Sequence, residues 1–215
     1  MKFPFFASFV IFILVLQHNI RKGKRTSEQA EAEFWKRESS ANDVRRQSLE
    51  DLPYITFKAE PFFPVNLLDA ADCPEFLSSN PDVKEILSRF LFLEQQKIVN
   101  LNEYTNTDLK FKYGVANLPS LTDMDSNYNE LITLLHNYGN TFANAGYEDQ
   151  AITIWEYAVS IGTDISSTYL LLAKIYQETS QWNKIDQLKK EAEIISTSRK
   201  DSIVRKLQEF GPCNG

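Results

Sequence analysis

The feature that most constrains the fold is an internal repeat in the C-terminal part of the chain, with a period of about 34 residues. When the chain is shifted by this period, residues of similar size or hydrophobicity align: Leu135 with Tyr169, Tyr138 with Leu172, Gly139 with Ala173, Phe142 with Tyr176, and Ala158 with Ala192. Large and small apolar residues that recur at helical spacing predict helical hairpins, which cross where the small residues lie. The sequence therefore predicts an all-α fold.

This pattern resembles the tetratricopeptide repeat, a helical hairpin whose length and order of large and small residues it shares. The first repeat, residues 132–165, matches at Tyr138, Gly139, Phe142, Gly146, Ala151, Trp155 and Ala158. The second repeat, residues 166–197, matches at Tyr169, Leu172, Ala173, Tyr176 and Ala192. It departs at Ser180, Ile185 and Lys189, where the family usually has glycine, alanine and an aromatic residue. Residues 198–210 are predicted to form the closing helix that such arrays need.

The resemblance implies a binding site for a protein or peptide on the face formed by the first helix of each hairpin. Alignment with the family places six candidate partner-binding residues on this face: His136, Asn140, Asn144, Leu170, Lys174 and Gln177. Asn140 matches an asparagine with which chaperone-tail-binding members hold a terminal carboxylate. That subclass is disfavoured, because His136 stands where those members have lysine and Leu171 stands where they have a second asparagine.

An apolar run at residues 3–16, with Ser8 as its only polar side chain, predicts a membrane anchor. The run is shorter than the about 20 residues of a typical span, and the apolar stretch of a signal peptide is the alternative. An anchor is favoured because no small-x-small cleavage site follows the run and a basic cluster does, formed by Arg21, Lys22, Lys24 and Arg25. We therefore expect a single-pass protein of the cell membrane with its N-terminus outside and its C-terminal domain in the cytoplasm.

The basic cluster has two interpretations, which are compatible: it sets the topology, or it also contacts anionic lipid.

The chain then divides into a transmembrane anchor (1–20), a basic juxtamembrane helix (21–50), an extended strap rich in proline and aromatic residues (51–80) and an α-helical domain (81–215). Prolines interrupt any helix in the strap. After Pro81 the apolar spacing predicts a helix with five buried residues: Val83, Ile86, Leu87, Phe90 and Leu93. Residues 99–121 lack periodicity and are predicted to form a structured loop.

Function is expected to be non-enzymatic. The sequence has no nucleophile motif, phosphate-binding glycine loop or zinc-binding helix motif, and two His and two Cys are too few for a structural zinc site. We expect no cofactor, and reduced thiols at Cys73 and Cys213. Residues 51–215 carry a net charge of −9, which argues against nucleic acid as a partner.

The whole layout is also similar to uncharacterised bacterial single-span membrane proteins, a likeness that implies no activity. Together these features predict a membrane-tethered adaptor or scaffold, with membrane lipid at the anchor and a protein or peptide partner in the repeat groove. The alternative is a structural or regulatory subunit of a membrane complex that forms homo-oligomers, in which the repeats are only structural.

Overall fold

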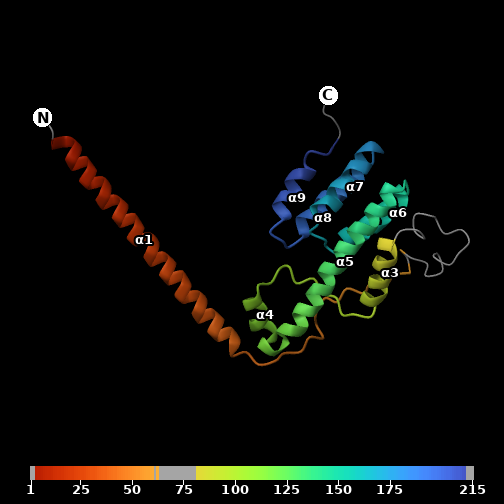
Figure 1. The fold of residues 1–215 in the computed structure, drawn as a ribbon, viewed down its shortest axis with the longest axis horizontal. Coiled ribbons are helices and arrows are strands. Elements are labelled where there is room, and N and C mark those ends of the chain that lie inside the picture. The colour runs from red at the N-terminus through yellow and green to blue at the C-terminus, as the bar shows by residue number, and fades with distance from the viewer. Residues whose placement is uncertain (1–2, 61, 63–80, 212–215) are drawn as a thin grey trace, which may run out of the picture. The chain divides into compact units, whose positions relative to one another are not determined.

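The computed structural model describes residues 3–60, 62 and 81–211, and every regular element among them is helical, which confirms the all-α prediction. The elements are α1 (Phe3–Asn42), α3 (Pro81–Leu93), α4 (Asn106–Tyr113), the 3-10 helix η2 (Val115–Asn117), α5 (Leu118–Asn144), α6 (Glu148–Ser160), α7 (Ser166–Glu178), α8 (Trp182–Ile194) and α9 (Lys200–Leu207) (Figure 1). They form two compact units. Met1–Ser48 and Thr105–Leu118 make the α1–α4 unit, and Leu49–Tyr104 and Pro119–Gly215 make the repeat unit.

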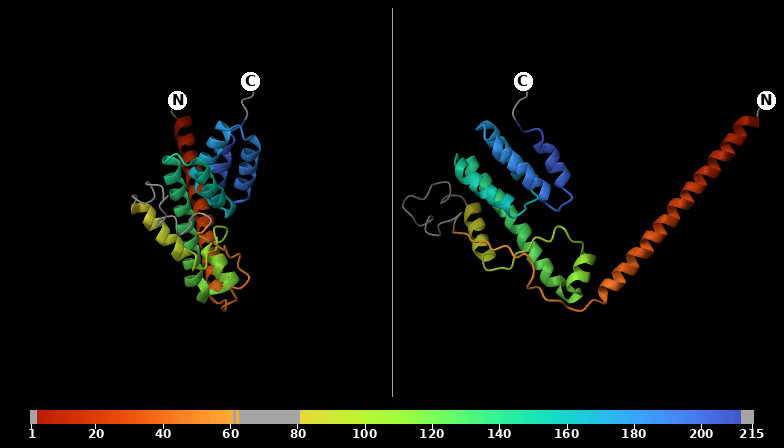
Figure 2. Two further views of the ribbon diagram at one scale, coloured as in Figure 1. Left: turned by 90° about the vertical axis from the view of Figure 1, so that its right-hand side faces the viewer. Right: turned by 180° about the vertical axis from the view of Figure 1, so that it is seen from behind.

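The helix boundaries in the repeat unit recur with the period of the sequence repeat. Equivalent boundaries are the ends of α5 and α7 at Asn144 and Glu178, the starts of α6 and α8 at Glu148 and Trp182, their ends at Ser160 and Ile194, and the starts of α7 and α9 at Ser166 and Lys200. Helices α6 to α9 pack side by side in sequence order (Figure 2). The chain therefore has the helical-repeat architecture predicted from its sequence, and α9 begins where the first helix of a third repeat would.

The turn inside each hairpin is the same in both repeats. Two backbone N–H groups of the turn donate to carbonyl groups near the end of the first helix and close the turn. The N···O distances are 2.9 and 3.1 Å in the first hairpin and 2.7 and 3.1 Å in the second. This closure requires a residue in the left-handed conformation after the helix. The residue is Gly146 in the first hairpin, with φ +84°, and Ser180 in the second, with φ +55°. Serine therefore occupies a backbone conformation that favours glycine.

Ser180→Gly is expected to stabilise the protein by about 0.5–1 kcal/mol, because it removes the steric cost of a side chain in the left-handed region. The urea midpoint of unfolding, followed by circular dichroism, measures this gain. Thr179→Gly is the matched control. Thr179 has φ −94°, so the glycine there should lower the midpoint. An unchanged or lower midpoint for Ser180→Gly would contradict the proposed strain.

A small residue lies at the equivalent position on the first helix of each hairpin. In the first hairpin Gly139 contacts the indole of Trp155, which is only 1% exposed. The equivalent residues of the second hairpin are Ala173, which is buried, and Lys189, whose ammonium donates to the Phe210 carbonyl at 2.8 Å. The second hairpin thus has alanine in place of the glycine on its first helix and lysine in place of the tryptophan on its second.

Helix α3 closes the other side of the core. Its buried residues are the five predicted from the sequence. Arg89 donates two hydrogen bonds to Glu130 of α5, at 2.5 and 2.6 Å. The described part of the strap adds aromatic side chains, since Phe57 packs on Phe90 with ring centroids 5.3 Å apart and Phe62 packs on Tyr157 at 4.8 Å. Residues 61 and 63–80 of the strap, with Cys73, lie outside the described residues, as does Cys213.

Helix α1 overturns the predicted localisation. It is one continuous helix of 40 residues, in which the apolar run passes into the charged segment without a break. The 14 apolar residues rise only about 21 Å as a helix, against about 30 Å of hydrocarbon in a bilayer. No helix in the described part of the chain is both long and apolar enough to cross a membrane. The predicted transmembrane helix, with the N-terminus outside and the C-terminal domain in the cytoplasm, is therefore wrong.

The C-terminal part of α1 packs on α4. Ala41 is fully buried, and Glu38 accepts hydrogen bonds from Thr107, at 2.8 Å, and from the Lys110 ammonium. Arg37 pairs with Asp108 at 2.5 Å. In the basic cluster the side chains of Lys22 and Lys24 are exposed, while those of Arg21 and Arg25 lie outside the described set. The segment predicted as a loop, residues 99–121, contains α4, η2 and the start of α5.

Candidate peptide-binding groove

A groove of about 510 Å³ lies between α5 and α7. Its lining residues, hereafter the α5–α7 groove, are His136, Asn140, Ser167, Leu170, Leu171, Lys174 and Phe210. His136 and Leu170 are equivalent positions in the two repeats, as are Asn140 and Lys174. The groove is therefore built by the repeat itself, from the same helical face used twice.

The structure brings four of the six predicted partner-binding residues into this groove: His136, Asn140, Leu170 and Lys174. The other two do not line it. Asn144 is exposed at the last position of α5, and Gln177 is half-buried near the end of α7. Both lie one turn beyond the groove residues of their helices.

Three lining residues were missed in the sequence: Ser167, Leu171 and Phe210. The first two complete a stripe on α7 with Leu170 and Lys174, at helical spacings of 3, 4 and 7. That spacing was visible in the sequence and would have identified them. Phe210 follows α9 and reaches the groove through tertiary packing, for which the sequence carries no local signal.

His136 links the two helices. Its Nδ1 lies 2.9 Å from the hydroxyl of buried Thr168, and its Nε2 lies 3.0 Å from the Asn140 amide nitrogen. Burial lowers the pKa of His136, so the ring is neutral at pH 7. Because the Asn140 amide donates to Nε2, the ring proton is assigned to Nδ1, which donates to Thr168. The imidazole therefore fixes the amide of Asn140 at the edge of the groove.

The Ser167 hydroxyl also lies 3.2 Å from Nε2 of His136, a distance that invites comparison with a catalytic serine and histidine. The surroundings differ from such a pair. Asn140 already donates to Nε2, and the Thr168 hydroxyl occupies the place where a carboxylate would orient the ring. The Ser167 hydroxyl therefore shares Nε2 of His136 with the Asn140 amide.

The rest of the α5–α7 groove is apolar with one cation. Leu170, Leu171 and Phe210 are all partly buried against the core. Lys174 is exposed, and its ammonium lies 3.8 Å from Glu178 of the same helix, a spacing at which exposed pairs contribute little. The chemistry offered to a ligand is thus an apolar surface, an oriented amide and a flexible ammonium.

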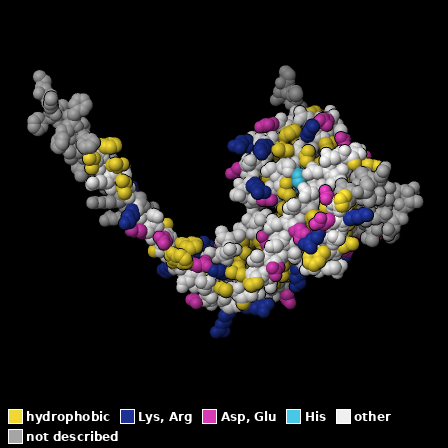
Figure 3. All heavy atoms as spheres, in the orientation of Figure 1, with side chains coloured by type: hydrophobic (Ala, Val, Ile, Leu, Met, Phe, Trp, Pro, Cys, Tyr) yellow, Lys and Arg dark blue, Asp and Glu magenta, His cyan; other side chains and the backbone are white. Residues whose placement is uncertain are grey.

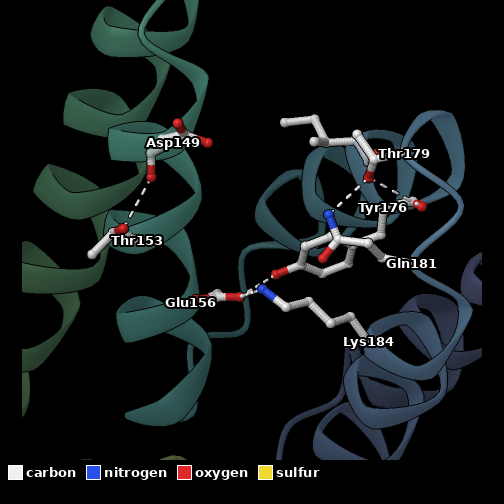
Figure 4. A network of polar contacts seen from close by, with 8 residues as sticks. Asp149, Thr153, Glu156, Tyr176, Thr179, Gln181 and Lys184 are labelled. Atoms are coloured by element: carbon white, nitrogen blue, oxygen red, sulfur yellow. Dashed lines mark hydrogen bonds and ion pairs between the residues drawn. The ribbon is translucent and has the colours of Figure 1, made fainter.

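A polar network separate from the α5–α7 groove links α6, α7 and α8. The Tyr176 hydroxyl of α7 donates to Glu156 of α6 at 2.6 Å, and the Lys184 ammonium of α8 donates to the same oxygen at 2.9 Å (Figure 4). Burial acts to raise the pKa of Glu156, but the hydrogen bonds from Lys184 and Tyr176 lower it on balance. Burial and the bond to Glu156 together raise the pKa of Tyr176. The network therefore holds three helices together with an ionised carboxylate.

The described residues contain no cluster of three or more His, Cys, Asp or Glu side chains able to hold a metal ion. On the visible face of α7 to α9, basic and acidic side chains are interspersed with hydrophobic ones (Figure 3). The α5–α7 groove thus remains the site at which the predicted residues converge.

No family model, curated protein or solved structure matches the chain.

Proposed function

We propose that the protein is a non-enzymatic adaptor that holds a peptide segment of a partner protein in the α5–α7 groove. One observation carries this proposal: equivalent positions of the two repeats line one groove. The resemblance to the tetratricopeptide repeat supports it, since arrays of that family bind along the first helices of their hairpins. The proposal concerns the repeat unit and does not depend on the localisation of the chain.

The groove suits a peptide with an apolar side chain beside hydrogen-bonding backbone. Leu170, Leu171 and Phe210 would receive the apolar side chain, and the Asn140 amide and Lys174 ammonium would bind peptide carbonyl or carboxylate oxygens. His136 holds Asn140 in place before a ligand arrives, which reduces the entropy lost on binding. Binding on this rigid pair of helices would recruit the partner without any chemical step.

Selection of peptides from a random display library by the purified full-length protein tests the proposal. Affinities of the enriched peptides are then measured by fluorescence anisotropy for wild type and for the groove variants Leu170→Ser and Lys174→Ala. We expect Leu170→Ser to weaken binding about tenfold, equivalent to about 1.4 kcal/mol. Lys174→Ala should weaken it about threefold, as for an exposed charge.

Asn144→Ala and Gln177→Ala are the matched controls, because these residues lie on the same helices outside the groove. They should change affinity less than about twofold, and circular dichroism verifies that every variant is folded. Equal losses in control and groove variants, or unchanged affinity in Leu170→Ser, would contradict binding in the α5–α7 groove.

Self-association is the second candidate, and the exposed apolar face of α1 favours it. Phe12, Leu16 and Ile20 recur every four residues and are 62%, 47% and 60% exposed. Phe34 and Trp35 are also exposed further along the helix, and hydrophobic side chains gather on two stretches of α1 (Figure 3). A peptide library that yields no binder, together with a homo-oligomer in light scattering, would favour this function over the adaptor.

A further inference from the structure

A second groove lies on the repeat unit, along the ends of α6 and α8. It consists of two hollows of about 590 and 370 Å³ that share Val159, Ser160 and Glu191 and therefore form one trough. Residues 53–56 of the extended segment before α3 and residues 100–103 border it. None of its lining residues belongs to the α5–α7 groove. We call it the α6–α8 groove.

The floor of the α6–α8 groove is apolar. Val159 and Ile195 are buried beneath it, and Tyr157 and Ile161 are half-buried at its side. At its rim stands Ile194, which is 73% exposed, the highest value among the exposed large hydrophobic residues that the structure describes. An apolar floor with an exposed isoleucine at the rim offers a surface for aliphatic side chains of a partner.

The charges of this groove are acidic and unbalanced. Glu103 and Glu191 line it, and neither side chain has a hydrogen bond or ion pair among the described residues. The lining residues include one cation, Lys184, which is already paired with Glu156 at 2.9 Å. The whole repeat unit carries 23 Asp or Glu against 12 Lys or Arg, a net charge of −11. A field of this sign concentrates cationic ligands in the groove.

We infer that the α6–α8 groove binds a basic peptide segment in which Lys or Arg residues alternate with aliphatic ones. The cationic groups pair with Glu103 and Glu191, and the aliphatic side chains cover Ile194 and Ile195. A protein segment fits better than a small molecule, because both hollows are open to solvent, whereas small-molecule pockets enclose most of their ligand. This partner segment is separate from the one proposed for the α5–α7 groove.

The test measures binding of a fluorescein-labelled peptide of alternating lysine and leucine to the full chain by anisotropy. Two matched probes replace either the lysines by glutamate or the leucines by serine. The Lys/Leu probe should bind, and both matched probes should bind at least about tenfold more weakly. Glu103→Gln combined with Glu191→Gln should weaken the Lys/Leu probe about five- to tenfold, because two partly exposed ion pairs are lost.

The control variant combines Glu193→Gln with Glu209→Gln, which removes the same charge from exposed residues outside the groove. It should keep the affinity within about twofold, as should Leu170→Ser in the other groove. Ile194→Ser, at an exposed position that leaves folding intact, should weaken the Lys/Leu probe about threefold.

Several results would overturn the inference. If the control pair weakens binding as much as the groove pair, net charge alone attracts the peptide. If the Lys/Ser probe binds as well as the Lys/Leu probe, the apolar floor takes no part. If Leu170→Ser abolishes binding while the Glu103 and Glu191 changes do not, the peptide occupies the α5–α7 groove instead.

Discussion

Gly139→Ala is expected to destabilise the protein by about 2–3 kcal/mol, although alanine normally stabilises a helix interior by about 1 kcal/mol relative to glycine. The added methyl group would lie 2.6 Å from Cδ1 and 2.7 Å from Cε2 of Trp155. Trp155 has little room to move, because it is buried and its indole N–H donates to the His136 carbonyl at 3.2 Å. Urea unfolding followed by circular dichroism measures the loss.

A double-mutant cycle isolates this contact. Trp155→Leu alone should destabilise the fold through lost packing, but in that background Gly139→Ala should cost much less than in wild type, with a coupling energy of about 1–2 kcal/mol. The second repeat already shows that a methyl group is accepted at the equivalent position, Ala173, where lysine replaces the tryptophan. A Gly139→Ala protein as stable as wild type would show that the two helices can separate without cost.

Gly114→Ala should destabilise the α1–α4 unit by about 3 kcal/mol, because Gly114 has φ +82° and ψ 151°, a conformation that costs other residues about 1–3 kcal/mol, and its surroundings are tight. Its added Cβ would lie 2.5 Å from the Arg45 carbonyl oxygen and 2.9 Å from the Arg46 nitrogen. These are backbone atoms, so the segment after α1 would have to move away as a whole. Faster hydrogen exchange of the α4 amides is the expected measurement.

Gly146→Ala separates the two causes. Gly146 has a similar φ, +84°, but a Cβ there would meet nothing within 4 Å. Gly146→Ala should therefore lower the free energy of unfolding only by the conformational cost of a side chain at positive φ, about 1–2 kcal/mol. It should leave the hydrogen exchange of the α4 amides unchanged. If the two glycines are equally sensitive, the approach of the Arg45 backbone contributes nothing.

Packing of the repeats could be predicted because it depends on local pattern. The repeat period, the small residue at Gly139 and the buried face of α3 all follow from spacing and side-chain size. These local patterns predict the packing in the folded protein, because helices that are neighbours along a repeat array also pack against each other. The same alignment selected four residues that line one groove, but it could not give the contribution of Phe210 to that groove, which depends on how α9 ends.

Two segments were predicted wrongly for physical reasons. In residues 99–121 the many Asn, Thr and Tyr residues suggested a loop, yet Thr105 and Asp108 form a capping box that starts α4. The start of α5 was missed although Leu121, Met124 and Tyr128 are spaced for one buried helical face. At the N-terminus hydrophobicity was given more weight than length, and the short apolar run continues into a charged helix.

The packing of α6 to α9 in sequence order also bears on how this part of the chain folds. Each of these helices contacts helices that are at most two positions away along the chain. Contacts between such near neighbours close short loops, which favours rapid folding. Structure can then spread from whichever hairpin forms first, one helix at a time, as in other linear arrays. Strengthening the turn at Ser180 would accordingly speed the growth of the second hairpin rather than act on one contact alone.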